Sequence, residues 1–132
     1  MAVKVPQTLA HLHYWSVKLT RSASEDEVLN AFRSSSRIAL IRAGDGLAAI
    51  NTVKELMADL GRPHDNLYEV ALWEDMLKVE GDELFYAYMV DNQAIVIPDT
   101  IDAIRALTGL AGTAEDSIAQ TNEALGVRTR FY

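Results

Sequence analysis

Apolar and polar side chains alternate over the first twenty residues, and this pattern constrains the fold most. The side chains of one parity are largely aliphatic or aromatic, namely Val3, Val5, Leu9, His11, His13, Trp15, Val17 and Leu19. The other parity carries Lys4, Thr8, Ser16, Lys18 and Thr20. A period of two is typical of a β-strand with one buried face. We therefore predict a strand over residues 2–20, which Pro6 should interrupt or place at a sheet edge.

Two later segments have the period of amphipathic helices. SASEDEVLNAF contains a capping box, because Ser24 is followed three residues later by Glu27. AGDGLAAINTVKELMADLG is the clearest helical pattern, and Gly61 and Pro63 mark its end. Its apolar stripe consists of Leu47, Ile50, Val53, Met57 and Leu60.

The remaining segments complete the predicted fold. RIALIR, LYEVALW and MLKVEGDELFYAYMV read as strands, and VEGDEL joins two of them in a hairpin. IVIPDTIDAIRALTG is predicted to pass from a strand into a helix, TAEDSIAQTNEALG to form the last helix, and VRTRFY to be loose. The order β-α-β-α-β-β-β-α-α predicts one α+β domain over residues 1–132: a mixed, largely antiparallel sheet with helices packed on one face.

The charge and the residue types exclude several functions. A net charge of −7 argues against binding to nucleic acid or to an anionic membrane surface. No apolar run is long enough to span a membrane, and the start lacks the pattern of a signal peptide. With no cysteine, these residues form no disulfide, thiolate metal site or cysteine nucleophile, which fits a cytoplasmic protein. The local cationic groups are expected to be scattered surface charge, namely Arg33, Arg37, Arg42, Arg128 and Arg130.

Two of the three histidines, His11 and His13, are one residue apart in the first predicted strand. This spacing places both imidazoles on one face, about 7 Å apart. A metal site would need a third protein ligand, and His64 lies in a loop with no carboxylate placed beside it. The other interpretations are histidines of the core or of an interface, and an acid–base role.

Other polar clusters are weaker candidates. The carboxylates of two acidic groups are expected to be solvated, namely Glu74, Asp75, Glu80, Asp82 and Glu83. RAGDG, residues 42–46, faintly resembles a phosphate-binding turn, but it lacks the third glycine of a dinucleotide fingerprint and the lysine of a P-loop. The serines 34–36 have no histidine near them in the sequence, so a serine nucleophile is not supported.

Three collinear stretches resemble the C-terminal part of archaeal-type (class II) glyceraldehyde-3-phosphate dehydrogenases. They are MAVKVPQTLAHLH, DGLAAINTVKELMADLGRPHDNLYEVALWEDMLKVEGDELFYAYMV, and VIPDTIDAIRALTG followed by DSIAQTNEALG. The most specific pieces are DLGRPHDNLYEV, IPDTIDAIRAL and TNEALG. The resemblance implies part of the catalytic domain of a phosphorylating, NAD(P)-dependent oxidoreductase of glycolysis and gluconeogenesis.

The resemblance also implies roles for single residues. In this family the catalytic base follows Val-Pro in a Thr-Thr-Leu-Met-His-Gln-His motif and activates a cysteine. This chain has VPQTLAHLH, so His11 matches the base, with Thr8 and His13 as supporting residues. Gln7 and Ala10 depart from the motif, and residues 91–94, DNQA, replace the family's His-Gln-Glu-Ser.

These 132 residues contain neither the family's nucleophilic cysteine nor a dinucleotide fingerprint. We therefore expect the isolated chain to be inactive and to bind no cofactor alone, while the full-length family uses NAD or NADP. Met1-Ala2-Val3 matches an internal stretch of the family, which is expected for a C-terminal portion. The expected partners are further copies of the chain, in a dimer or tetramer formed through the sheet face, and the missing dinucleotide-binding part. The alternative is a diverged, non-catalytic binding or oligomerisation module with the same fold.

Overall fold

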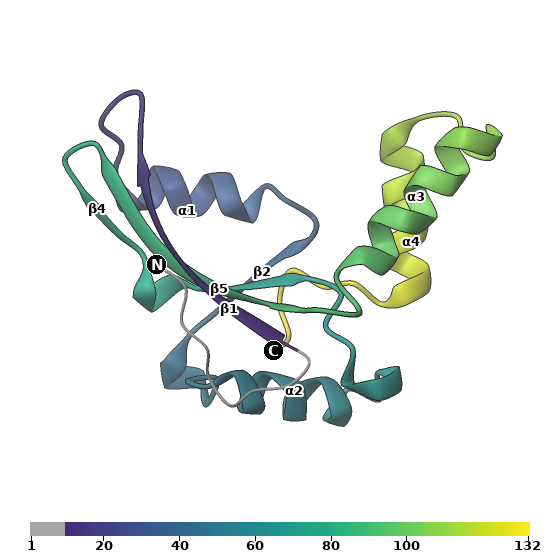
Figure 1. The fold of residues 1–132 in the computed structure, drawn as a ribbon, viewed down its shortest axis with the longest axis horizontal. Helices are drawn as coiled ribbons and strands as arrows, with labels where there is room; N and C mark the ends of the chain where they lie inside the picture. Colours follow the sequence, from purple (N-terminus) through teal and green to yellow (C-terminus); the bar gives the residue numbers. More distant parts are fainter. Residues whose placement is uncertain (1–9) are drawn as a thin grey trace.

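The structure, a computed structural model, describes residues 10–132. In this range, five strands and four α-helices follow in the predicted order (Figure 1). The strands are β1 (Ala10–Lys18), β2 (Ile38–Ile41), β3 (Val70–Trp73), β4 (Lys78–Glu80) and β5 (Glu83–Asp91). The α-helices are α1 (Glu25–Arg33), α2 (Ile50–Asp59), α3 (Val96–Thr108) and α4 (Ala114–Leu125). None of the helices in residues 10–132 has the length and apolar character to cross a membrane.

The strands form one mixed sheet in the order β1-β5-β3-β2, and β4 pairs with β5 beside this path. Among the strands of residues 10–132, only the β2–β3 pair is parallel, since these two strands are joined through α2, and the other pairs are antiparallel. Glu80 pairs with Glu83 in the β4–β5 hairpin, which confirms the predicted turn at Gly81 and Asp82. The predicted α+β class is therefore confirmed. Strands β1 and β2 lie at the two edges of the sheet.

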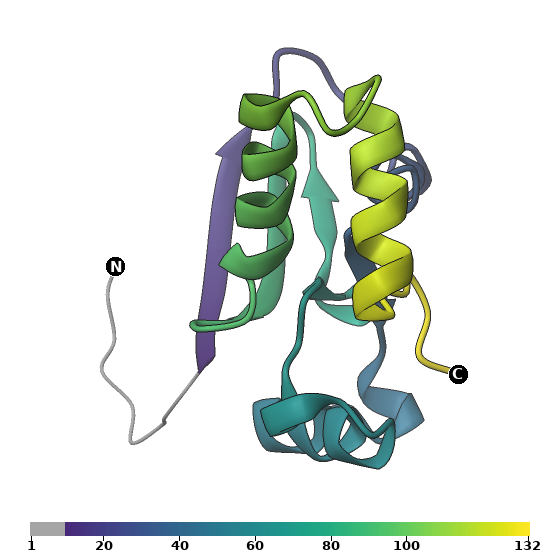
Figure 2. The same cartoon turned by 90° about the vertical axis from the view of Figure 1, so that its right-hand side faces the viewer.

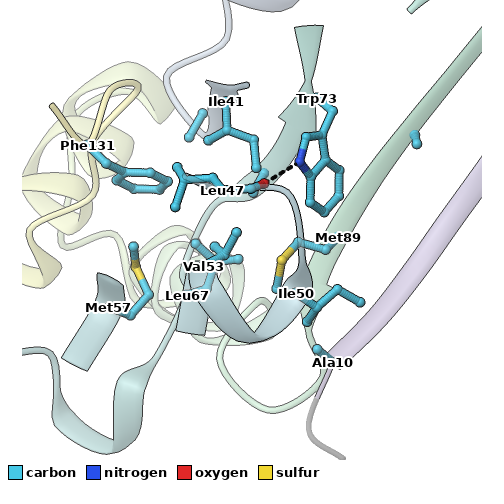
Figure 3. Close-up of a cluster of buried hydrophobic side chains, with 13 residues drawn as sticks. Ala10, Ile41, Leu47, Ile50, Val53, Met57, Leu67, Trp73, Met89 and Phe131 are labelled. Atoms are coloured by element: carbon cyan, nitrogen blue, oxygen red, sulfur yellow. Dashed lines mark hydrogen bonds between the residues drawn. The ribbon is translucent and has the colours of Figure 1, made fainter. Parts of the chain in front are cut away.

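The helices cover both faces of the sheet, whereas the sequence pattern predicts one covered face. Helix α1 contributes Val28, Leu29 and Phe32 to a cluster around Leu72 and Leu84 on one face. Helix α2 packs on the other face (Figures 1 and 3). The buried cluster on this face consists of Ala10, Ala39, Ile41, Leu47, Ile50, Val53, Met57, Leu67, Ala71, Trp73, Ala87, Met89 and Phe131. The reason lies in β3, whose consecutive residues Ala71, Leu72 and Trp73 are all buried, so both parities need a cover.

Helix α1 begins as predicted. The Ser24 hydroxyl accepts a hydrogen bond from the Glu27 backbone N–H at 3.1 Å, and the Glu27 carboxylate accepts one from the Ser24 N–H at 2.8 Å. Helix α2 is shorter than predicted, because the chain first makes a 3-10 turn at Ala43–Asp45. Gly61 follows the end of α2 with φ 72°, the left-handed conformation that favours glycine.

Helices α3 and α4 lie side by side as an antiparallel pair at one end of the sheet (Figures 1 and 2). The strand predicted just before Pro98 is absent, since α3 begins at Val96. Arg37, directly before β2, joins the pair to the sheet through Asp99, Asp102 and Asn122. Burial acts to raise the pKa of the Asp102 carboxyl, but hydrogen bonds from Ser117, Thr121 and Arg37 outweigh burial and lower this pKa to about 2.

Strand β1 and the C-terminal tail differ from their predictions. Residues 2–9 lie outside the described range, and in β1 only Ala10 is buried, while Trp15 is 47% exposed. An edge strand has one neighbour only, which leaves both of its faces less covered. The tail is not loose, because Phe131 is buried in the cluster that α2 forms with the sheet (Figure 3) and the Tyr132 hydroxyl donates to Asp45 at 2.6 Å.

Candidate functional site

His11 and His13 lie on one face of β1, as the alternation predicts. Their ring centroids are 5.9 Å apart, and the planes of the two rings are inclined at 72°. The His13 ring stacks on Tyr88 of β5, with centroids 4.8 Å apart and an angle of 11°. The Trp15 indole N–H donates to the Tyr88 hydroxyl at 3.2 Å. Neighbours in the sheet thus hold the half-buried His13, while His11 is exposed.

The geometry suits His11 to take a proton from a group that reaches the sheet edge. A general base must come within hydrogen-bond reach of the proton it removes, and an exposed imidazole on an edge strand can be reached. His13 is less available because one face of its ring is covered by Tyr88. Thr8, the other predicted supporting residue, lies outside the described residues.

The structure does not bring the histidines together with further metal ligands. His64 lies in the 3-10 turn Pro63–Asp65 with φ 54°. Within residues 10–132, no three His, Cys, Asp or Glu side chains are grouped so that they could hold a metal ion. The metal interpretation of His11 and His13 therefore has no third described ligand.

The turn at residues 42–46 does not fit the pyrophosphate of a dinucleotide. The Asp45 carboxylate accepts hydrogen bonds from Arg42 at 2.8 Å and from the Tyr132 hydroxyl at 2.6 Å, so an acid occupies this turn. A Cβ added at Gly44 or Gly46 would meet no atom within 4 Å, so neither glycine marks a close approach. Gly46 is explained by its φ of 85°. The described residues thus provide no site for NAD or NADP at this turn.

The DNQA segment has a structural role that the sequence did not predict. Asp91 is 2% exposed, and one of its oxygens accepts a hydrogen bond from Lys54 Nζ at 2.5 Å. Its other oxygen accepts from the backbone N–H groups of Gln93 and Ala94, at 3.0 and 3.1 Å. Burial acts to raise the pKa of the Asp91 carboxyl, but these partners outweigh burial and lower the pKa. Asp91 therefore turns the chain from β5 into α3.

A second buried carboxylate, Glu69, was also missed. Arg62 donates two hydrogen bonds to it, from Nη1 at 2.6 Å and from Nη2 at 2.7 Å, and the Arg128 backbone N–H donates a third at 2.7 Å. Glu69 has no exposed surface, and the Arg62 side chain is 7% exposed. Both residues belong to the stretch DLGRPHDNLYEV. A stretch with Pro63 that is neither α-helix nor strand separates them, so no helical or strand period predicts that they pair.

The acidic candidates Glu74 and Asp75 also hold the structure together, although Asp75 is exposed, as predicted, and Glu74 is half-buried. Arg33 of α1 donates to the Glu74 carboxylate at 2.9 Å, which joins α1 to the end of β3. The Asp75 carboxylate accepts from the Ala43 backbone N–H at 2.8 Å. Both carboxylates thus fix loops around the ends of β2 and β3.

Comparison with known proteins relates the chain to one group of enzymes. The chain matches no protein-family model. It is 42% identical over 126 residues to the glyceraldehyde-3-phosphate dehydrogenase of Methanopyrus kandleri and 41% identical over 127 residues to that of Hyperthermus butylicus. It is 36% identical over all 132 residues to the enzyme of the same name from Thermoplasma volcanium. The match covers 96–100% of this chain but only 36–39% of these relatives. The predicted resemblance to archaeal glyceraldehyde-3-phosphate dehydrogenases is thereby confirmed, for a chain that spans little more than a third of their length.

Proposed function

We propose that this chain is the C-terminal portion of the catalytic domain of a phosphorylating, NAD(P)-dependent glyceraldehyde-3-phosphate dehydrogenase of glycolysis or gluconeogenesis. The observation that carries the proposal is the sequence match to archaeal enzymes of that name, which extends over at least 96% of the chain at 36–42% identity. Binding of NAD or NADP falls to the other part of the longer enzyme, and a cytoplasmic location goes with this assignment. The 132 residues alone contain no cysteine, so we propose that they are inactive in isolation.

In this proposal His11 is the general base. Its imidazole takes the proton of a cysteine thiol that the remainder of the enzyme brings to the edge of β1, and the thiolate then attacks the aldehyde. The exposure of His11 at this edge supports the role. His13 supports the strand through its stacking on Tyr88, and Thr8 is the second supporting residue.

Complementation tests this function. The chain, mixed with an N-terminal fragment of an archaeal relative that carries the cysteine and the dinucleotide site, should show NAD(P)-dependent aldehyde oxidation that neither piece shows alone. His11→Ala should lower kcat about 100-fold to 10,000-fold, the usual contribution of a general base. His64→Ala, in an exposed turn, is the matched control and should keep full activity. Activity of the chain alone, or a fully active His11→Ala complex, would contradict the proposal.

We also propose that the isolated chain self-associates through the β1 side of the sheet. Strand β1 is an edge with exposed large side chains on both faces, since Tyr14 is 69% exposed, Trp15 47% and Leu12 38%. A long apolar edge favours pairing with another strand, and a second copy supplies an identical one. Lys18 is the single Lys, Arg, Asp or Glu in β1, so antiparallel pairing about Tyr14 opposes no like charges.

Light scattering coupled to size exclusion tests this association. The unaltered chain should elute as a dimer or tetramer, and Trp15→Lys should shift it towards the monomer because a charge then lies in the paired edge. Leu107→Lys is the control, since Leu107 is 87% exposed on α3, away from β1. An unaltered chain that is monomeric at high micromolar concentration would refute the proposal.

One observation favours a second candidate function, a non-catalytic binding or oligomerisation module with the same fold. The segment that replaces the family's His-Gln-Glu-Ser is occupied with structural hydrogen bonds around Asp91. In the complementation experiment, a stable complex without dehydrogenase activity would favour this module over the enzyme fragment.

A further inference from the structure

We propose a second ligand site in this chain, a pocket for a small phosphate-bearing molecule at the β2 edge of the sheet. A cavity of about 530 Å³ opens here between α1, β2 and the C-terminal tail. It is lined by Arg33, Ile38, Leu40, Arg42, Glu74, Thr129, Arg130 and Tyr132. This volume lies within the usual range of small-molecule sites.

The lining brings three arginines together in an acidic protein. Three guanidinium groups, those of Arg33, Arg42 and Arg130, come from three separate segments of a chain whose net charge is −7. Glu74 offsets the charge of Arg33, and Asp45, beside the lining, offsets that of Arg42. Arg130 is the arginine of the lining that has no carboxylate partner among residues 10–132. Guanidinium groups are the side chains that proteins most often use for phosphate, because their N–H groups donate charge-assisted hydrogen bonds to its oxygens.

Each of the three arginines retains donors for a ligand. Arg33 uses one terminal nitrogen on Glu74 and the other on Asn30 Oδ1, at 2.9 and 3.1 Å, and its Nε–H has no hydrogen-bond partner among residues 10–132. Arg42 uses Nε and one terminal nitrogen on Asp45, at 2.8 and 3.3 Å, which leaves its other terminal nitrogen. Arg130 is exposed and makes no ion pair within the described part of the chain.

The remaining lining indicates a ligand with a carbon body and not the bare ion. Ile38 and Leu40, alternate residues of β2, are half-buried and present aliphatic surface below the arginines. Tyr132 closes the tail side, where its hydroxyl is held by Asp45 at 2.6 Å, and Thr129 adds a hydroxyl group. We therefore assign the pocket to organic phosphates, with the phosphate on the arginines and the body on β2.

The pocket is separate from the histidine site. Strands β1 and β2 are opposite edges of the sheet, with β5 and β3 between them, so His11 and the arginines do not share a ligand. The assignment does not rest on the proposed enzymatic function. A chain that failed in complementation could still bind phosphate here.

Titration of the ¹⁵N-labelled chain tests the site, with phenyl phosphate and inorganic phosphate as probes at constant ionic strength. We expect saturable shifts at residues 129–132 and at the Arg33 side chain, and tighter binding of phenyl phosphate. Arg130→Ala should weaken phenyl phosphate binding at least about tenfold, since it removes a charge-assisted hydrogen-bond donor. Arg128→Ala is the matched control, because Arg128 lies in the same tail outside the lining and should bind as before.

Three results would overturn the site. Shifts that do not saturate, or that sodium chloride reproduces at equal ionic strength, would mean general screening of surface charge. If Arg130→Ala and Arg128→Ala bound phenyl phosphate with equal affinity, Arg130 would not contact the ligand. Inorganic phosphate binding as tightly as phenyl phosphate would exclude the apolar part of the pocket. Because Arg130 is exposed and its side chain forms no hydrogen bond or ion pair with the other residues of the range 10–132, its variant should fold normally, and unchanged shifts elsewhere in the spectrum check this.

Discussion

Replacing Glu69 with glutamine should lower the free energy of unfolding by about 3–5 kcal/mol, the usual result of removing one partner of a buried ion pair. Glutamine has the length of glutamate but presents one acceptor oxygen and an NH₂ group. The two parallel bonds from Arg62, at 2.6 and 2.7 Å, cannot then both form. The Arg62 charge remains buried without its counter-charge. Urea unfolding followed by far-UV circular dichroism measures the change.

The cost should be large because Glu69 joins the end of α2, the start of β3 and the distant C-terminal tail. Arg62 follows α2, Glu69 precedes β3, and the Arg128 N–H that donates to Glu69 belongs to the tail after α4. Lys18→Gln is the control, since the exposed Lys18–Asp82 pair at 3.4 Å should contribute less than about 1 kcal/mol. A loss below about 1 kcal/mol in Glu69→Gln would show that water reaches this pair.

The double variant Arg62→Met with Glu69→Leu separates charge from hydrogen bonding. Apolar residues of similar volume often replace a buried pair without loss. Here recovery should be partial only, because Arg62 also donates to the Gly126 carbonyl at 2.7 Å and Glu69 accepts from the Arg128 N–H. These two backbone groups would lose their partners in the double variant.

The element order could be predicted because it depends on local patterns. The alternation in β1 and β5, the capping box at Ser24 and the glycine after α2 each act within a few residues. The covering of both faces depends on where β3 lies in the sheet, which no local window contains. The start of α3 depends likewise on Asp91, which is buried and accepts a hydrogen bond from Lys54 of α2, 37 residues before it.

The candidate site was predictable only in part. The period of two places His11 and His13 on one face, and the structure confirms this. The period could not predict that His13 stacks on Tyr88, which lies 75 residues away in the sequence. The arginines at 33, 42 and 130 were interpreted as scattered because they are far apart in the sequence. They meet at one cavity because the tail folds back beside β2. Buried carboxylates such as Glu69 are rare without a partner, and the sequence alone did not identify that partner.

Replacing Phe131 with alanine should destabilise the protein by about 3 kcal/mol, although Phe131 is the penultimate residue. Its side chain is 7% exposed within the cluster of α2 (Figure 3), and the Arg62 guanidinium lies 5.8 Å from its ring centroid. Alanine would leave a cavity there and remove this cation–π contact. Thermal and urea unfolding of Phe131→Ala measure the loss. Thr129→Ala, exposed in the same tail, is the control, and its free energy of unfolding should stay within about 0.5 kcal/mol of that of the unaltered chain.

Because the tail also forms one wall of the arginine cavity, Phe131→Ala should weaken phenyl phosphate binding as well. Unchanged stability would show that the tail is not packed against the core in solution, and the cavity would then lose its wall.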